Sequence, residues 1–102
     1  METISPWVCG QLVIELDAQT VAFQDREICL TSLEFKALFY LVRHPGQYVR
    51  AEILLEQVWH CEAGGTPDQV KSCIKRLRRK LGAQGAKYIQ THWGFGYRFA
   101  IP

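Results

Sequence analysis

Residues 66–81, TPDQVKSCIKRLRRKL, decide the fold of this chain. Their apolar residues recur at intervals of four, three and four, which is the spacing of one stripe along an α-helix. Thr66 and Gln69 form a Thr-x-x-Gln capping box, and Pro67 suits the first helical position. Gly82 follows as a natural stop. The stretch therefore predicts an amphipathic helix with its core stripe at Val70, Ile74, Leu77 and Leu81.

The side of this helix opposite the apolar stripe is basic. At about 100° per residue, the outward positions are Ser72, Lys75, Arg76 and Arg79. Residues 66–102 hold eight lysines and arginines against one acid, a net charge of +7, whereas residues 1–65 hold four against nine, a net charge of −5. A basic helix face is often only solvated surface. The charge asymmetry between the two parts favours instead a polyanionic partner.

Length and composition exclude several classes of protein. The chain has 102 residues, 48% of them hydrophobic and 22% charged, which predicts one folded domain. No apolar run reaches the ~20 residues of a membrane span, and the N-terminus lacks a signal pattern, so we expect a cytoplasmic protein without membrane contact. Residues 1–6 carry no pattern and are expected to be disordered or a linker, with the domain at residues 7–102.

Neither a metal site nor an active site is expected. The four cysteines lie 20, 32 and 12 residues apart, without the short spacing of a zinc site, so reduced thiols are expected. The three histidines have no nucleophile or carboxylate arrangement around them, and no phosphate-binding glycine motif is present. We therefore expect a protein that is not an enzyme and has no cofactor.

The remaining patterns give the order of elements. Alternating apolar residues predict strands at 11–16, 20–24 and 27–30, joined by turns at 17–19 and 25–26, which must pair as an antiparallel meander. A Thr-x-x-Glu capping box at 31–34 opens a helix that Pro45-Gly46 ends, and a second helix is expected at 51–59.

The C-terminal region predicts a β-hairpin. Alternation at 88–92 and 97–101 flanks a Gly-x-Gly tip, and Tyr97, Phe99 and Ile101 are expected on one core face. The paired glycines of the loop His60–Gly65 predict an exposed, mobile segment. The fold class is therefore α+β: a winged helix-turn-helix with an N-terminal antiparallel β-meander, three helices and a C-terminal hairpin as the wing.

Four motifs carry a family resemblance: Leu30-Thr-x-x-Glu34-Phe35, Leu54-Leu55-x-x-Val58-Trp59, Val70-x-x-x-Ile74-x-Arg76-Leu77-Arg78-x-x-Leu81 and Ile89-x-Thr91-x-x-Gly94-x-Gly96-Tyr97-Arg98-Phe99. In combination and order they resemble the OmpR/PhoB-type winged-helix DNA-binding domain, the C-terminal effector domain of many two-component response regulators. The resemblance covers about Leu12 to Ile101. It implies a four-stranded N-terminal sheet, with a further strand near Trp7–Cys9.

The resemblance also implies which residues meet DNA. Lys75, Arg76 and Arg78 correspond to the basic residues of the recognition helix, Thr91 to a phosphate contact, and Tyr97 to the wing tyrosine. With the outward helix positions, the expected DNA-binding residues are Ser72, Lys75, Arg76, Arg78, Arg79, Thr91, Trp93 and Tyr97. Domains of this family bind direct repeats as tandem pairs, and the loop corresponding to His60–Gly65 can contact RNA polymerase.

The chain departs from the family at three places. The wing, commonly Thr-Val-Arg-Gly, reads Thr91-His92-Trp93-Gly94 here. The recognition helix opens with Asp68-Gln69, and Arg50 takes the place of the usual Ser/Thr cap of the second helix.

We expect a transcription regulator that binds double-stranded DNA sequence-specifically, with 66–81 in the major groove and 89–100 on the backbone and minor groove. The alternative is a protein-interaction module using the 60–65 loop and Trp93. A receiver domain does not fit within 102 residues.

Overall fold

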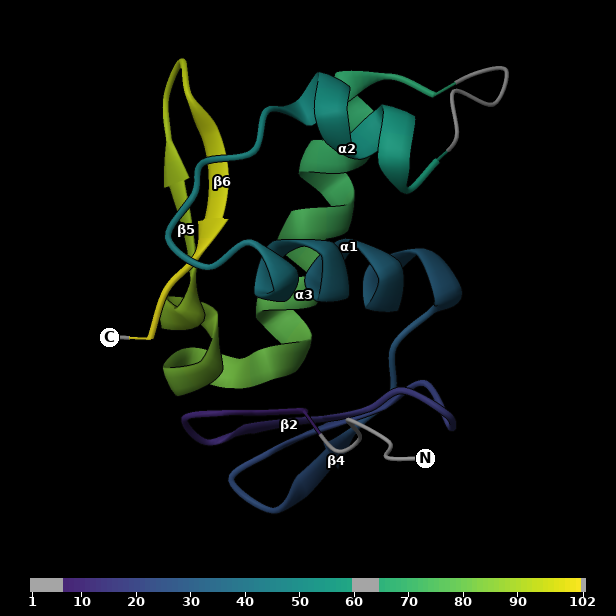
Figure 1. The fold of residues 1–102 in the computed structure, drawn as a ribbon, viewed down its shortest axis with the longest axis vertical. Helices are drawn as coiled ribbons and strands as arrows, with labels where there is room; N and C mark the ends of the chain where they lie inside the picture. The colour runs from purple at the N-terminus through teal and green to yellow at the C-terminus, as the bar shows by residue number, and fades with distance from the viewer. Residues whose placement is uncertain (1–6, 60–64, 102) are drawn as a thin grey trace.

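The computed structural model describes residues 7–59 and 65–101, which form two β-sheets around three helices (Figure 1). The N-terminal sheet holds β1 (Trp7–Cys9), β2 (Leu12–Glu15), β3 (Thr20–Phe23) and β4 (Arg26–Ile28). The helices are α1 (Ser32–Arg43), α2 (Ala51–Gln57) and α3 (Pro67–Gly85), followed by a short 3₁₀ turn, η1 (Ala86–Tyr88). The hairpin consists of β5 (Ile89–His92) and β6 (Gly96–Phe99). This is the expected fold class, and it is confirmed.

The N-terminal sheet is an antiparallel meander in the order β1-β2-β3-β4. The strand that the family resemblance implied near Trp7–Cys9 is confirmed, because β1 pairs with β2 along its whole length. The predicted turn at Asp25-Arg26 was wrong by one residue. Gln24 and Asp25 take positive φ angles of 53° and 65°, as a two-residue hairpin turn requires, and Arg26 pairs with Phe23 inside β4.

The first two helices begin as predicted. Thr31 Oγ1 accepts a hydrogen bond from Glu34 N at 3.2 Å, and Glu34 Oε1 accepts one from Thr31 N at 3.0 Å, which completes the capping box of α1. At α2, Arg50 makes no side-chain cap, as expected. That helix ends at Gln57 rather than Trp59, although the Trp59 side chain is still buried beyond its end.

The third helix is interrupted where the sequence predicted its end. Gly82 has φ 83° and ψ 178°, outside the helical region, so the regular helix stops there. The linker predicted at 83–86 was wrong: the chain resumes helical geometry to Gly85 and continues into η1. At the other end, Thr66 Oγ1 accepts a hydrogen bond from Gln69 N at 3.4 Å, which forms one half of the predicted capping box.

The hairpin packs beside α3 and is joined to the helical part through Val49, which forms a β-bridge with Tyr97 (Figure 1). Gly96 is required at this crossing, because a Cβ there would lie 2.2 Å from the Val49 carbonyl oxygen, and its φ is +118°. Phe99 is buried as predicted. The expectation for Ile101 was wrong, because β6 ends at Phe99 and the Ile101 side chain is 55% exposed.

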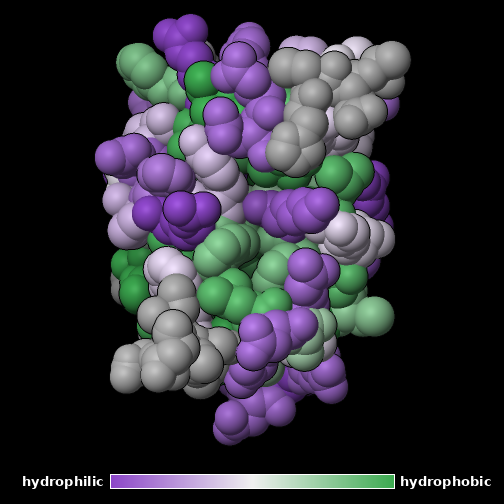
Figure 2. All heavy atoms as spheres, turned by 45° about the vertical axis from the view of Figure 1, so that its right-hand side comes forward, coloured by the Kyte–Doolittle hydropathy of each residue, from purple (hydrophilic) through white to green (hydrophobic). Residues whose placement is uncertain are grey.

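One hydrophobic core joins these layers, with α3 at its centre. The sheet contributes Leu12, Ile14, Val21 and Phe23, α1 contributes Leu38 and Leu41, and α3 contributes its predicted stripe of Val70, Ile74, Leu77 and Leu81. The face drawn in Figure 2 is hydrophilic at its upper and lower parts, with apolar residues near its middle. Among the helices of the described residues, none combines the length and apolar character that crossing a membrane requires.

Candidate nucleic-acid interface

The six basic residues of α3 fall into two sets. We call Lys71, Lys75 and Arg79 the exposed cations; Arg76 is exposed as well but belongs to the second set. The other three, which we call the anchored cations, donate hydrogen bonds to partners elsewhere in the chain: Arg76, Arg78 and Lys80. The periodicity of the helix alone did not separate these two sets.

Glu34 holds two of the anchored cations. Its side chain is fully buried in α1, where its carboxylate accepts from Lys80 Nζ at 2.7 Å and from Arg76 Nε at 3.1 Å. Burial raises the pKa of Glu34, but the hydrogen bonds from Lys80, Thr31 and Arg76 outweigh it, so the pKa lies below its ordinary value. The buried charge thus joins the first turn of α1 to the recognition helix.

The sequence holds a signal for this ion pair beyond the capping box of α1. Glu34 occupies the same helical stripe as Leu38 and Leu41, at intervals of four and three. A carboxylate within an apolar stripe requires a cationic or hydrogen-bonding partner once it is buried. The basic helix predicted at 66–81 is the natural candidate for that partner.

Arg78 connects α3 to the wing. Its Nε and Nη2 donate to the Ile89 carbonyl oxygen at 3.1 and 3.0 Å, and Nη2 also donates to Thr91 Oγ1. Burial lowers the pKa of Arg78 from its ordinary value and raises that of Tyr97 nearby. Three of the expected site residues, Arg78, Thr91 and Tyr97, therefore lie together where the wing faces α3.

A groove of about 250 Å³ separates α3 from the hairpin. Five of the eight expected DNA-binding residues line it, together with Lys71 and Ile74: Lys75, Arg78, Thr91, Trp93 and Tyr97. Ser72 and Arg76 line a different hollow, beside Leu33 and Trp59, and Arg79 is exposed on α3. The structure thus brings most of the expected residues to one strip of surface formed by α3 and the wing.

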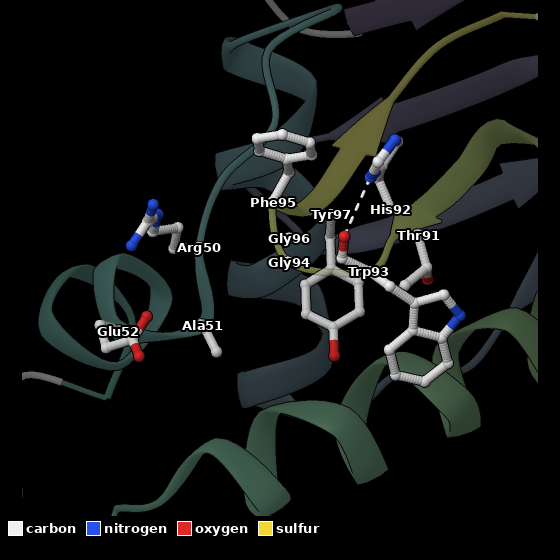
Figure 3. A pocket seen from close by; sticks show the side chains of 10 residues that line it. All are labelled: Arg50, Ala51, Glu52, Thr91, His92, Trp93, Gly94, Phe95, Gly96 and Tyr97. Carbon is white, nitrogen blue, oxygen red and sulfur yellow. Dashed lines mark hydrogen bonds between the residues drawn. The ribbon is translucent and has the colours of Figure 1, made fainter.

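The wing tip has two aromatic sides (Figure 3). On the side away from α3, the Phe95 ring lies 4.6 Å from that of His92 and 6.4 Å from that of Tyr48, and the Arg98 guanidinium lies 4.7 Å from the Tyr48 ring. On the side of α3, Trp93 is 80% exposed, with Lys71 Nζ 5.6 Å from its ring centre. The hairpin is therefore braced by rings other than Trp93.

The cysteine of α3, Cys73, is fully buried and adds nothing to this surface. Within residues 7–59 and 65–101, no group of three His, Cys, Asp or Glu side chains is placed to hold a metal ion. Burial, followed by the charge of Glu34, raises the pKa of Cys73 to about 11, so its thiol stays protonated near neutral pH. The predicted mobile loop His60–Gly65 lies, except for Gly65, outside the described residues.

A basic helix packed on its neighbour and flanked by a β-hairpin defines the class of winged-helix DNA-binding domains. The chain belongs to the family of the transcriptional regulatory protein C-terminal domain, whose model matches residues 25–99. This is the OmpR/PhoB-type effector domain that the sequence motifs resembled, and that resemblance is confirmed. Members of the family and the structural neighbours are DNA-binding effector domains of transcription regulators.

Three known proteins illustrate the similarity. The transcriptional regulatory protein SrrA of Staphylococcus aureus is 40% identical over 93 residues, which cover 88% of this chain and 39% of SrrA. The chain thus spans about two fifths of that relative's length. The response regulator DrrB of Thermotoga maritima, an OmpR/PhoB homologue, superposes with a TM-score of 0.82 at 34% identity, over 92% of this chain and 43% of DrrB. The DNA-binding domain of Klebsiella pneumoniae RstA, solved in complex with the RstA box, gives a TM-score of 0.79 at 29% identity, over 91% and 94% of the two chains.

Proposed function

We propose that this chain binds double-stranded DNA sequence-specifically as the effector domain of a transcription regulator. In this proposal α3 enters the major groove, and the wing lies on the adjacent backbone and minor groove. The observation that carries the proposal is the set of exposed cations on α3, Lys71, Lys75 and Arg79, of which Lys71 and Lys75 line the wing groove. Cations at this density neutralise phosphates, and a major groove about 12 Å wide admits one helix.

On α3, the outward residues Ser72, Lys75, Arg76 and Arg79 contact DNA. Lys75 and Arg79 are exposed and pair with phosphates as mobile charges. Arg76 combines two roles: its Nε donates to Glu34, while its side chain is still 51% exposed. Because a guanidinium has five N–H donors, the groups beyond Nε can bond to guanine O6 and N7 or to a phosphate. The fixed Nε orients that fork.

At the wing, Thr91 and Tyr97 donate their hydroxyl groups to phosphate oxygens. The Thr91 oxygen already accepts a hydrogen bond from Arg78, which leaves its own O–H as a donor for DNA. Arg78 was expected to contact DNA from sequence, and that stays a prediction. Its bonds to Ile89 and Thr91 support a role in positioning the wing against α3.

The proposal includes partners other than DNA. Two copies bind direct repeats in tandem, the His60–Gly65 loop contacts RNA polymerase, and the protein acts in the cytoplasm. A protein-interaction module is the second candidate, favoured by the exposure of Trp93 (80%) and Phe95 (55%) at the wing tip.

Selection from a pool of random duplexes, followed by binding titrations over a range of salt, tests the proposal. We expect a defined binding site. We also expect log Kobs to fall linearly with log salt, with a slope of about −0.9 for each phosphate neutralised. Lys36→Ala is a suitable control, since Lys36 is an exposed lysine on α1, and it should leave that slope unchanged. Failure to enrich any sequence, or binding insensitive to salt, would contradict the proposal.

Chemical-shift mapping with the selected duplex separates the two candidates. Perturbations should concentrate on α3 and the wing if the chain binds DNA as proposed. Perturbations confined to other residues would favour the protein-interaction module.

A further inference from the structure

Trp93 has the highest exposed fraction of any large apolar side chain among the described residues, at 80%. Such a residue is costly to leave in water and is commonly part of a contact surface. Its surroundings are unusual for a protein-contact patch, because three cations line the same groove: Lys71, Lys75 and Arg78. Apolar area within a cationic rim matches a polyanion that also offers apolar faces, which is the chemistry of sugars and bases between phosphates.

The geometry places Trp93 on the side of the wing that faces the recognition helix. Thr91 and Trp93 are two residues apart, both line the groove, and the indole lies over α3 in Figure 3. Phe95 points away from α3 in the same view. When the exposed cations of α3 meet DNA, Trp93 is therefore the aromatic residue of the wing tip that reaches the neighbouring backbone.

The indole has one ring face partly occupied. Lys71 Nζ lies 5.6 Å from the ring centre, a cation–π distance that holds the ring beside α3. At 80% exposure, the rest of the ring is open to a second partner. A neutral indole releases no counterions when it binds, so its contribution differs in kind from that of an arginine.

We propose that Trp93 packs its open face on deoxyribose and base edges at the minor groove next to the α3 site. This inference rests on the proposed DNA-binding function. The wing then adds affinity by apolar contact, and this part of the binding energy does not depend on salt. The cations of α3 supply the salt-dependent part.

Titrations of the selected duplex with Trp93→Ala and Trp93→Arg over a range of salt test this inference. Loss of the apolar contact predicts that Trp93→Ala binds about tenfold more weakly at every salt concentration, with an unchanged slope. Trp93→Arg should steepen the slope by about 0.9, since it adds one phosphate-neutralising charge. Trp93→Phe should retain much of the wild-type affinity.

Phe95→Ala is the matched control, because it removes the other exposed aromatic of the same wing tip. It should change Kd much less than Trp93→Ala. Thermal unfolding of each variant verifies that the fold is kept, which is expected for a residue as exposed as Trp93. Wild-type affinity in Trp93→Ala would overturn the inference, as would a loss confined to low salt. If Trp93→Ala kept the wild-type affinity while Lys75→Ala reduced the salt slope, the DNA-binding function would still be supported. Only the inference about Trp93 would then fail, so the two failures are distinguishable.

A spectroscopic measurement gives a second readout. The fluorescence of Trp93 is obtained as the difference between the wild type and Trp93→Phe. Acrylamide should quench this fluorescence strongly in the free protein and much less in the DNA complex. Equal quenching of that difference in the free and bound states would overturn the inference.

Discussion

The cations of α3 differ in their environment: some are exposed to solvent, and others are hydrogen-bonded to the rest of the domain. Lys75 is exposed beside the wing groove, whereas Lys80, farther along the same helix, has its Nζ 2.7 Å from a carboxylate oxygen of the buried Glu34. Of the six cations of this helix, three are anchored to the rest of the domain, two of them by Glu34 and one by the Ile89 carbonyl. The number of basic residues on a recognition helix therefore overstates its freely available DNA contacts. Part of the charge fixes the helix in place.

Among the substitutions that test these two roles, replacing Glu34 should have the largest effect on the free energy of unfolding. Glu34→Gln keeps the shape but removes the buried charge that Arg76 and Lys80 share, so we expect a loss of about 2 kcal/mol in the free energy of unfolding. The figure is below that of a fully buried pair because the Arg76 and Lys80 side chains are 51% and 35% exposed. Urea unfolding measures the loss.

Glu56→Gln is the matched control, since it makes the same change at an exposed position of α2. It should alter the free energy of unfolding by less than about 0.5 kcal/mol. Equal effects of the two substitutions would show that the network between α1 and α3 adds no stability.

The same network predicts a dependence on pH. The pKa of Glu34 is lower in the folded than in the unfolded state, so its stabilising effect is complete above the unfolded value of about 4.3. That effect is lost as the pH falls through the folded pKa. The difference in stability between wild type and Glu34→Gln should therefore be largest above the unfolded value of about 4.3 and shrink as the pH falls below it. A difference that stays constant as the pH falls would contradict the assignment.

A smaller effect is expected at the junction of α3 and the wing. Arg78→Lys keeps the charge but loses the paired hydrogen bonds to Ile89, which should lower the stability by about 1 kcal/mol. The accompanying change should be broadening or shifting of the amide resonances of β5. The adjacent Arg79→Lys, at an exposed position, should leave both unchanged. Identical β5 amide spectra for Arg78→Lys and Arg79→Lys would contradict the proposed positioning role of Arg78.

Much of the fold was predictable because local patterns determine it. Spacing of apolar residues and capping boxes located α1 and α3, and Gly82 marked the break in the helix. The errors lie where tertiary contacts decide: the left-handed pair Gln24-Asp25 shifts a turn, and Trp59 is buried beyond the end of α2. The strand Trp7–Cys9 came from the family resemblance, since three residues show too little alternation to predict a strand.

The candidate site was predictable as a set of residues but not as a division of roles. Sequence spacing showed that Arg76 faces outward from the core stripe, but not that Glu34, 42 residues earlier, accepts from its Nε. It also named Arg78 and Thr91 without indicating that they bond to each other. Pairings across such separations depend on how elements pack, and helix periodicity carries no information about them.

The central claim is that the exposed cations of α3 bind DNA, whereas Arg78 and Lys80 hold the helix in place and Arg76 does both. Lys75→Ala and Lys80→Ala test it most directly, because they remove the same side chain from the two sets. Titrated with the selected duplex over a range of salt, Lys75→Ala should reduce the salt slope by about 0.9, and Lys80→Ala should keep the wild-type slope while lowering stability. Equal losses of slope in the two variants, or a loss only in Lys80→Ala, would contradict the claim.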